Sequence, residues 1–206
     1  MSYLMENGAK ARNSAIVARI GARVRELRAA RAMSLDALAV RSAVSRSMIS
    51  LIERGEASPT AVVLDKLASG LGVTLASLFD APGHEDESVG PVAKREDQPL
   101  WKDPASGYIR RNVSPPRTGH PMQIVEVSFP PGARVAFENP PRETPVYQQV
   151  WVLEGTIEIA LGAQQYRLRD GDCIAMQLDH PTMFHNPTRR TARYVVVIAS
   201  EAGSRR

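Results

Sequence analysis

The stretch 45–55 carries side chains with the chemistry to contact nucleic acid. Ser45 is a good helix N-cap, and Gly55 favours the left-handed conformation that ends many helices. At about 100° per residue, the helix between them gathers guanidinium and hydroxyl groups on one arc, with a single aliphatic residue and no carboxylate. This arc comprises Arg46, Ser47, Ser50, Leu51 and Arg54. An arginine side chain can donate two hydrogen bonds to guanine, a serine hydroxyl can bond a base or a phosphate, and a leucine side chain can contact a thymine methyl group. The arc is therefore typical of a helix in a DNA groove, although an ordinary surface helix is the alternative.

The opposite arc of this helix is predicted to be buried. It contains Met48, Ile49, Ile52 and Glu53. A lone carboxylate on a buried face is costly unless it is paired. Glu53 therefore needs a cationic partner or partial exposure.

The elements that must hold this helix are short helices on either side of it. Residues 1–14 show no hydrophobic periodicity and are expected to form a flexible tail, whereas residues 15–80 predict five helices. Ser34 and Thr60 are the expected caps of the second and fourth helices. The predicted core is Ile16, Ile20, Val24, Leu27, Leu35, Leu38, Ala39, Leu64, Leu67, Ala68, Leu71, Leu75, Leu78 and Phe79.

Several linked motifs in this region resemble one family. The segments 34–39, 44–55, 58–60 and 67–73 look like the lambda-repressor/Cro-like helix-turn-helix domain of the XRE family, over about residues 16–79. The resemblance implies a five-helix domain whose third helix enters the major groove while the second crosses the DNA backbone.

The resemblance also implies a role for individual residues of the third helix. Arg46, Ser47 and Leu51 match the family's base-reading positions. Ser45 and Met48 match positions near phosphate.

Further roles are expected for four residues of this domain. Leu35 stands at an often polar position of the second helix, where its backbone N–H can still meet a phosphate. Arg54 is a candidate phosphate contact near the end of the third helix. Arg28 occupies the place of a family arginine that pairs with the glutamate at Glu53, and this pair would fix how the third helix is held.

Charge is distributed unevenly along the chain. Residues 1–80 carry 11 Lys and Arg against 7 Asp and Glu, and the formal net charge of the whole chain is +4. The surplus of positive charge therefore lies in the predicted helical domain, which suits a polyanionic partner.

In the second half of the chain, apolar residues recur at every second position. Residues 81–107 are rich in Pro, Gly and acidic groups and predict a linker, and residues 201–206 a short tail. Between them, alternating apolar runs over 123–129, 149–153, 156–161, 166–168, 173–176 and 194–198 predict strands of a small β domain. His180 and His185 are expected at the surface, in the loop before the last strand.

Segments 152–155, 168–172 and 184–187 resemble the cupin family, a β-barrel of the jelly-roll type, over about residues 108–200. Many cupins hold a metal with three histidines and a glutamate. In this chain Gln148 stands at the position of the glutamate, and Thr182 stands at the position of the histidine that comes last along the chain. The positions of the other two histidines hold no histidine. The resemblance therefore predicts no metal and no cofactor, with an irregular site from His180, His185 and Glu143 as a weaker alternative.

The barrel interior remains a candidate site for an organic ligand. Neutral hydrogen-bonding groups among apolar walls suit such a ligand. The predicted ligand-binding residues are Gln148, Val150, Met176, Thr182 and Phe184. The alternative is a filled barrel that serves only for dimerisation.

Together these features predict a cytoplasmic, homodimeric transcriptional regulator that binds an operator in double-stranded DNA and senses a small molecule. The sequence contains no run of about 18 apolar residues, so no membrane-spanning helix is expected. Cys173 is the single cysteine, which excludes an intrachain disulfide. No catalytic residues are predicted. The competing hypotheses are a metal-dependent cupin dioxygenase or isomerase with an accessory helical domain, and a protein-binding adaptor.

Overall fold

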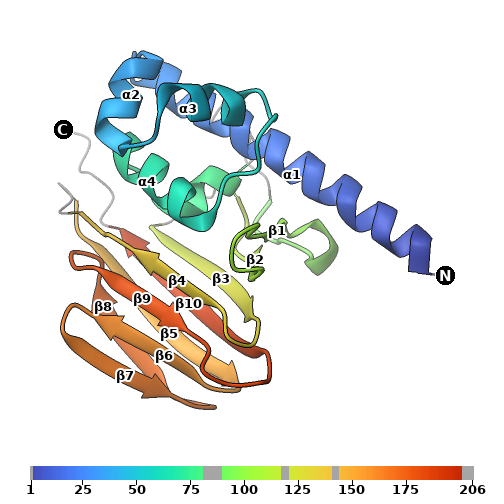
Figure 1. Cartoon of the computed structure of the whole chain (residues 1–206), viewed down its shortest axis with the longest axis vertical. Helices are drawn as coiled ribbons and strands as arrows, with labels where there is room; N and C mark the ends of the chain where they lie inside the picture. The colour runs from blue at the N-terminus through green and yellow to red at the C-terminus, as the bar shows by residue number, and fades with distance from the viewer. Residues whose placement is uncertain (1, 81–89, 117–120, 141–143, 201–206) are drawn as a thin grey trace.

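The computed structural model describes residues 2–80, 90–116, 121–140 and 144–200, with the side chains of residues 2–12 outside the description. A helical domain lies on one end of a two-sheet β domain (Figure 1). The acidic residues 85–87 of the predicted linker lie outside the described residues, and so does Glu143, the candidate metal ligand.

The helical domain contains four α-helices in its described part. These are α1 (Ser2–Ala30), α2 (Leu35–Ser42), α3 (Arg46–Glu53) and α4 (Ala61–Leu71). The predicted fifth helix is a 3₁₀-helix, η1 (Leu75–Phe79), so the expectation of five α-helices is wrong. A segment of five residues closes few i→i+4 hydrogen bonds, and the tighter 3₁₀ pattern is common in such short pieces.

Helix α1 begins at Ser2, whereas the sequence predicts a flexible tail over residues 1–14. Hydrophobic periodicity reports the burial of one helix face, and the stretch before Ile16 has none. The buried face of α1 comes after this stretch, with Ile16, Ile20, Val24 and Leu27 in the core as predicted.

One glycine allows α1 and α3 to pack closely. A Cβ atom added at Gly21 would lie 2.1 Å from the carbonyl oxygen of Ile52. The backbone of α3 therefore rests directly on α1 at this point. Ile49 and Ile52 are completely buried beside it.

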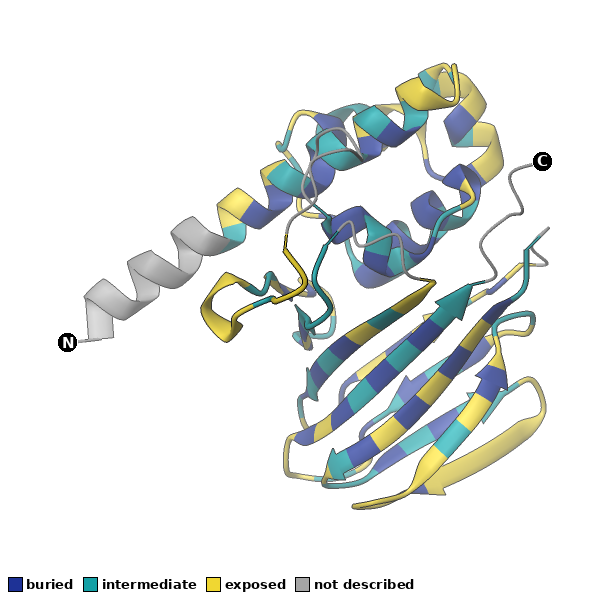
Figure 2. Ribbon diagram, turned by 180° about the vertical axis from the view of Figure 1, so that it is seen from behind, coloured by how far each residue is buried: buried dark blue, intermediate teal, exposed yellow. Residues whose placement is uncertain are grey.

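The β domain consists of two antiparallel sheets that face each other (Figures 1 and 2). The six-stranded sheet has the order β1 (Leu100–Lys102), β2 (Ile109–Asn112), β3 (Met122–Phe129), β10 (Ala192–Ser200), β5 (Val146–Glu154) and β8 (Cys173–Gln177). The four-stranded sheet has the order β4 (Arg134–Phe137), β9 (Thr182–His185), β6 (Ile157–Leu161) and β7 (Gln164–Leu168). The hydrogen-bonded ladders of the described residues thus form two sheets rather than one closed barrel.

Burial alternates along these strands, as the stripes in Figure 2 show. In β5 the buried side chains are Val146, Gln148, Val150 and Val152. The loop position predicted for His185 is wrong, because Thr182–His185 form β9 and alternate in burial. Thr182 and Phe184 are buried, and His185 is half-buried.

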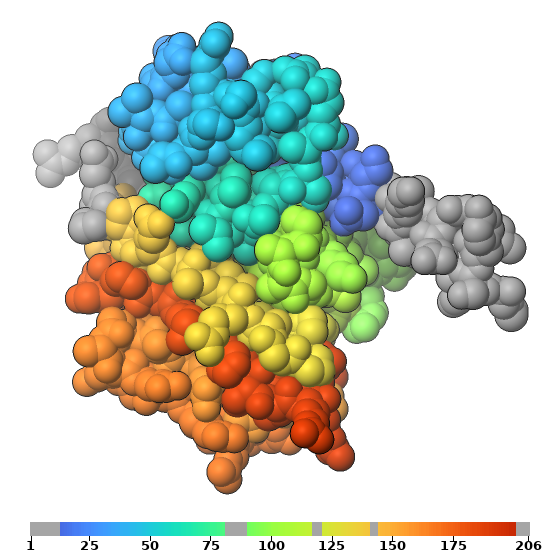
Figure 3. Space-filling model, in the orientation of Figure 1, coloured from blue at the N-terminus to red at the C-terminus, as the bar shows by residue number. Residues whose placement is uncertain are grey.

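The two domains are in direct contact, and part of the predicted linker makes that contact (Figure 3). Trp101, in β1, is only 1% exposed, and its ring lies edge-on to Phe79 of η1 at 5.6 Å and to Tyr108 at 5.8 Å. Asp103 accepts a hydrogen bond of 2.9 Å from the backbone N–H of Ala61, at the start of α4. Residues 100–103 therefore join the helices to the sheet instead of spanning solvent.

The close approach at Gly21 predicts a large loss of stability on substitution. Gly21→Ala should lower the free energy of unfolding by about 3 kcal/mol, because a methyl group there overpacks backbone against backbone. Urea denaturation followed by far-ultraviolet circular dichroism measures the loss. Gly90→Ala is the control, since its added Cβ meets nothing within 4 Å. Equal stability of the two variants would contradict the packing described.

Candidate nucleic-acid interface and interdomain cavity

Helix α3 presents its predicted DNA-contacting residues on the surface. Ser45 caps the helix, because its hydroxyl accepts from the backbone N–H of Met48 at 3.2 Å. The side chains of Arg46 and Ser47 are exposed, as is that of Arg54 just after the helix, whereas Ser50 and Leu51 are half-buried. The structure therefore brings these predicted residues together on one accessible face.

Two predicted contacts differ from a simple amphipathic pattern. Met48 is 38% exposed, so its expected place on the buried arc is wrong; it lies in the first turn of a helix whose core contacts are made by Ile49 and Ile52. The side chain of Leu35 packs against the core. Because Leu35 begins α2, its N–H belongs to the first turn, where helices leave backbone donors free for a ligand.

A buried ion pair fixes α3 to α1. Arg28 donates two hydrogen bonds to the carboxylate of Glu53, of 2.7 Å from Nε and 2.8 Å from Nη2. Arg28 also donates to the carbonyl of Met33 at 2.9 Å, so one guanidinium joins α1, the loop before α2, and α3. The hydrogen bond to Glu53 raises the pKa of Arg28, and the pair keeps the buried carboxylate compensated.

Exposed ion pairs surround the outer face of α3. Arg46 Nε lies 3.3 Å from Asp36 of α2. Arg54 donates to Glu56 at 2.7 Å and to the hydroxyl of Ser50 at 2.5 Å. The hydrogen bond between Arg54 and Glu56 raises the pKa of Arg54 and lowers that of Glu56. Exposed pairs of this kind contribute little to stability, so a phosphate or a base edge can replace the carboxylate.

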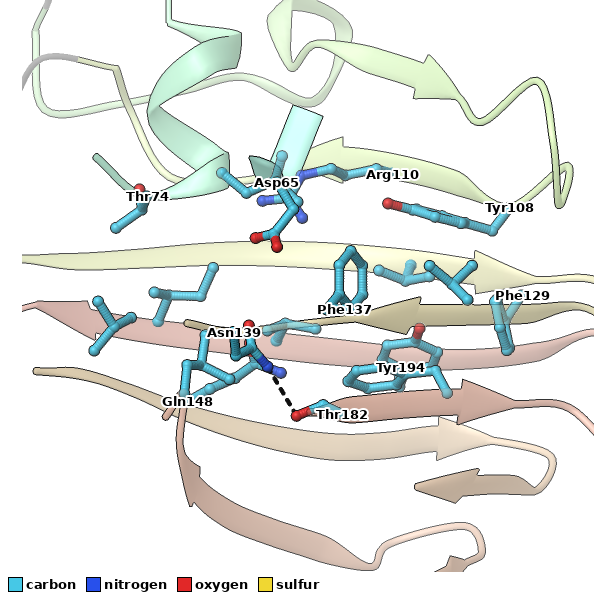
Figure 4. A pocket seen from close by; sticks show the side chains of 18 residues that line it. Asp65, Thr74, Tyr108, Arg110, Phe129, Phe137, Asn139, Gln148, Thr182 and Tyr194 are labelled. Atoms are coloured by element: carbon cyan, nitrogen blue, oxygen red, sulfur yellow. Dashed lines mark hydrogen bonds between the residues drawn. The ribbon is translucent and has the colours of Figure 1, made fainter. Parts of the chain in front are cut away.

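A cavity of about 70 Å³ lies where the two domains meet (Figure 4). Asp65, Thr74 and Leu75 line it from the helical domain, and strands of both sheets supply the remaining walls. Its polar lining is Asp65, Thr74, Arg110, Asn139, Gln148 and Thr182, and its aromatic lining is Tyr108, Phe129, Phe137, Phe184 and Tyr194. Asn139 donates to the hydroxyl of Thr182 at 2.9 Å.

Three of the five predicted ligand-binding residues line this cavity, namely Gln148, Thr182 and Phe184. Val150 and Met176 are buried but are not among the lining residues. Val150 lies one inward position beyond Gln148 on β5, and Met176 is the register partner of Gln148 on β8. The cavity is displaced from the predicted centre toward the helical domain.

Arg110 lines the cavity but is not among the ligand-binding residues predicted from the sequence. It is only 5% exposed; its Nε donates to Asn112 at 3.2 Å, and its guanidinium lies 5.2 Å from the ring centre of Phe79. Burial lowers the pKa of Arg110 and raises that of Tyr108 to about 12. The alternation of Tyr108 and Arg110 with Ile109 and Arg111 is the signal that could have placed it inside.

The comparisons with known proteins agree with the helical domain and extend along the chain. A family model described as a helix-turn-helix domain matches residues 19–80. The HTH-type transcriptional regulators SutR and PuuR of Escherichia coli K12 are 24% and 26% identical to this chain, over 83% and 85% of it and 89% and 91% of their own length. An HTH_3 family transcriptional regulator from Vibrio cholerae superposes with a TM-score of 0.72 and 25% identity, covering 91% of this chain and 98% of its own.

Residues 19–80 are therefore a helix-turn-helix domain, and over most of its length the chain is similar to HTH-type transcriptional regulators. No helix among the described residues is long and apolar enough to cross a membrane.

In this chain the two positions that the cupin resemblance matches to metal ligands hold Gln148 and Thr182. His180 pairs with its neighbour Asp179 at 2.5 Å, and His185 Nδ1 lies 3.0 Å from Glu158. Among the described residues, no three His, Cys, Asp or Glu side chains are grouped to hold a metal. The described polar groups that line the cavity are amides, hydroxyls, one guanidinium and the carboxylate of Asp65, and this set suits an organic ligand better than a transition metal, which needs several converging imidazole or carboxylate ligands.

The Arg28–Glu53 pair predicts an asymmetric response to substitution. Arg28→Met should lower the free energy of unfolding by about 3 kcal/mol, because the buried carboxylate of Glu53 loses both of its hydrogen bonds from Arg28 and keeps only the more exposed Arg25 nearby. The double variant Arg28→Met/Glu53→Leu should regain most of this loss, since an apolar pair can replace a buried ion pair. Urea denaturation measures both.

Arg25→Met is the matched control, because Arg25 is more exposed and lies 3.7 Å from the same carboxylate. It should change the stability by less than about 1 kcal/mol. A double variant no more stable than Arg28→Met would show that the pair does not act as described.

Proposed function

We propose that α3 of this regulator reads an operator in the major groove. The observation that carries the proposal is the exposed face of α3, where Arg46, Ser47 and Leu51 lie together above a buried anchor to α1. Arg46 would fork onto guanine, Ser47 would bond a base edge, and Leu51 would contact a thymine methyl.

Phosphate contacts would surround this base-reading centre. Ser45, Met48 and the N–H of Leu35 stand at the N-terminal ends of α3 and α2, where helix dipoles favour an anion. Ser50 and Arg54 would contact phosphate at the other end, after Arg54 exchanges Glu56 for the DNA backbone. These contacts orient the helix without reading sequence.

We further propose that the regulator is a homodimer joined through the outer face of its six-stranded sheet. Exposed apolar side chains lie in neighbouring strands there: Met122 and Ile124 of β3, and Tyr147 and Trp151 of β5, with β10 between them. The register places Met122 and Tyr147 on either side of Ala199, so the residues form one surface. A contiguous apolar surface of this kind is typical of a protein interface.

A two-fold dimer would present two α3 helices to half-sites about 34–36 Å apart. We propose that a small molecule in the interdomain cavity adjusts this presentation. The cavity is lined by α4, η1 and both sheets, so a ligand there would contact the elements that set the position of the helical domain. Control requires that the ligand bind one arrangement of the domains more tightly than another. We also propose that the protein is cytoplasmic, because a protein that binds an operator must share a compartment with the DNA.

Arg46→Ala is expected to weaken binding to a selected operator by about tenfold or more and to relax the base preference at one position, because a bidentate contact to guanine is lost. Binding selection from random DNA followed by fluorescence anisotropy measures both effects. Arg169→Ala, an exposed arginine of the β domain, is the control and should leave binding unchanged. If Arg46→Ala keeps the affinity and the preferred sequence of the native protein, α3 is not the reading helix.

Trp151→Glu is expected to dissociate the dimer, because Trp151 is 51% exposed in one chain and would be buried in the shared surface. Sedimentation velocity should show monomers at concentrations where the native chain is dimeric. Tyr166→Glu, on the exposed β7, is the control for adding one charge. A dimer that survives Trp151→Glu would place the interface elsewhere.

A further inference from the structure

A buried guanidinium with an unused donor lies in the wall of the interdomain cavity. The Nη2 atom of Arg110 is buried and has no hydrogen-bond partner in the described part of the chain. Its Nε donates to Asn112, and its face rests on Phe79, so the position of the side chain is fixed from two directions. Arg110 lines the cavity (Figure 4).

An arginine in this position requires an acceptor. Its guanidinium stays charged at neutral pH, and a buried charge without full compensation is costly. Nearby Tyr108 and Tyr194 do not supply a negative charge, because burial raises the pKa of both phenols far above neutrality. A carboxylate is the acceptor that best matches the planar fork of arginine, and such charge-assisted bonds are about twice as strong as neutral ones.

Among the described residues, the one carboxylate that lines the cavity is that of Asp65, and it does not bond Nη2 of Arg110. Asp65 has interactions of its own. Asp65 would oppose an anion placed beside it, so a carboxylate ligand must lie on the Arg110 side with its uncharged part toward the strands.

The size and the remaining walls of the cavity limit the ligand further. A volume of about 70 Å³ holds roughly five water-sized groups. Phe137, Phe184 and Tyr194 provide apolar contact, while the buried amide of Gln148 offers one polar contact. The ligand is therefore short and largely apolar beyond its charged end.

We propose that the effector is a small organic monocarboxylate whose anionic group binds Nη2 of Arg110. The inference rests on the proposed sensing function and adds the chemical class of the ligand. Because the same guanidinium lies on Phe79, at the end of the helical domain, binding would act directly on the contact between the domains.

The test uses the full chain and three sets of probes with matched carbon skeletons: acetate to valerate, the corresponding primary amides, and the corresponding amines. Isothermal titration calorimetry measures binding, and anisotropy with the selected operator measures its effect on DNA affinity. We expect at least one carboxylate to bind at least tenfold more tightly than its amide and amine. Its addition should change operator affinity.

Arg110→Met should weaken that carboxylate at least tenfold. Its unliganded melting temperature should stay near that of the native protein, since the variant removes an uncompensated charge. Gln148→Glu, which adds a negative charge to the cavity, should weaken the same ligand and covers the case in which Arg110→Met does not fold. Arg111→Met is the matched control, because Arg111 lies on the other face of β2 and pairs with Glu126, which still has Arg193 as a partner in the variant. This variant should bind the carboxylate as tightly as the native protein does.

Several outcomes would overturn the proposal. Carboxylates that bind Arg110→Met as tightly as the native protein, or that do not bind the native protein, contradict it. If an amine binds the native protein and no longer binds Asp65→Asn, the ligand is a cation and not a carboxylate. The proposed sensing function would then still stand. If no probe of any class binds or changes operator affinity, the sensing function fails together with the assignment of the ligand.

Discussion

The bidentate pair between Arg28 and Glu53 is the interaction on which the DNA-facing surface depends. Helix α3 has eight residues, too few for a stable isolated helix in water. Its position is determined by Ile49 and Ile52 in the core, by the close approach at Gly21, and by this ion pair. The pair adds direction, because two hydrogen bonds to one planar guanidinium fix the orientation of α3 about its axis.

With α3 held in this way, its polar face needs no further support from its own side chains. Arg46 and Arg54 form only exposed pairs, with Asp36 and Glu56, and these partners can be exchanged for DNA. The division is physically reasonable: the costly, buried interaction positions the helix, and the weak, exposed ones are available for recognition.

The second structural constraint is the contact between the domains. Trp101 lies between Phe79 and Tyr108, and the series of edge-on rings continues through Phe129 to Tyr194 at the cavity. Asp103 meets the start of α4, and Thr74 donates to Gln123 at 2.6 Å. A ligand beside Tyr194 and Arg110 therefore lies within one rigidly packed region that includes the end of the helical domain, which is the physical basis for the proposed control.

Much of this organisation could be predicted from the sequence because its signals are local. The caps Ser34, Ser45 and Thr60 and the buried positions of α1, α3 and α4 follow from side-chain type and helical period, and the structure contains them. Strands β1, β2, β4 and β9 were missed because they are only three or four residues long and carry too few alternations to stand out. Gly21 was missed for a different reason: a close backbone approach depends on what another element places opposite it, and no local pattern reports that. For Arg110 the local alternation gives the inward direction, but the ring of Phe79 that its guanidinium contacts comes from another element.

Methylation interference on the selected operator tests the central claim most directly, that an anchored α3 reads the major groove. N7 of guanine lies in that groove, where an arginine fork would contact it. The account predicts that N7 methylation blocks binding at one guanine in each of two half-sites, whose centres are one helical turn apart. Interference confined to adenine N3 in the minor groove, or no interference at any guanine, would contradict the account.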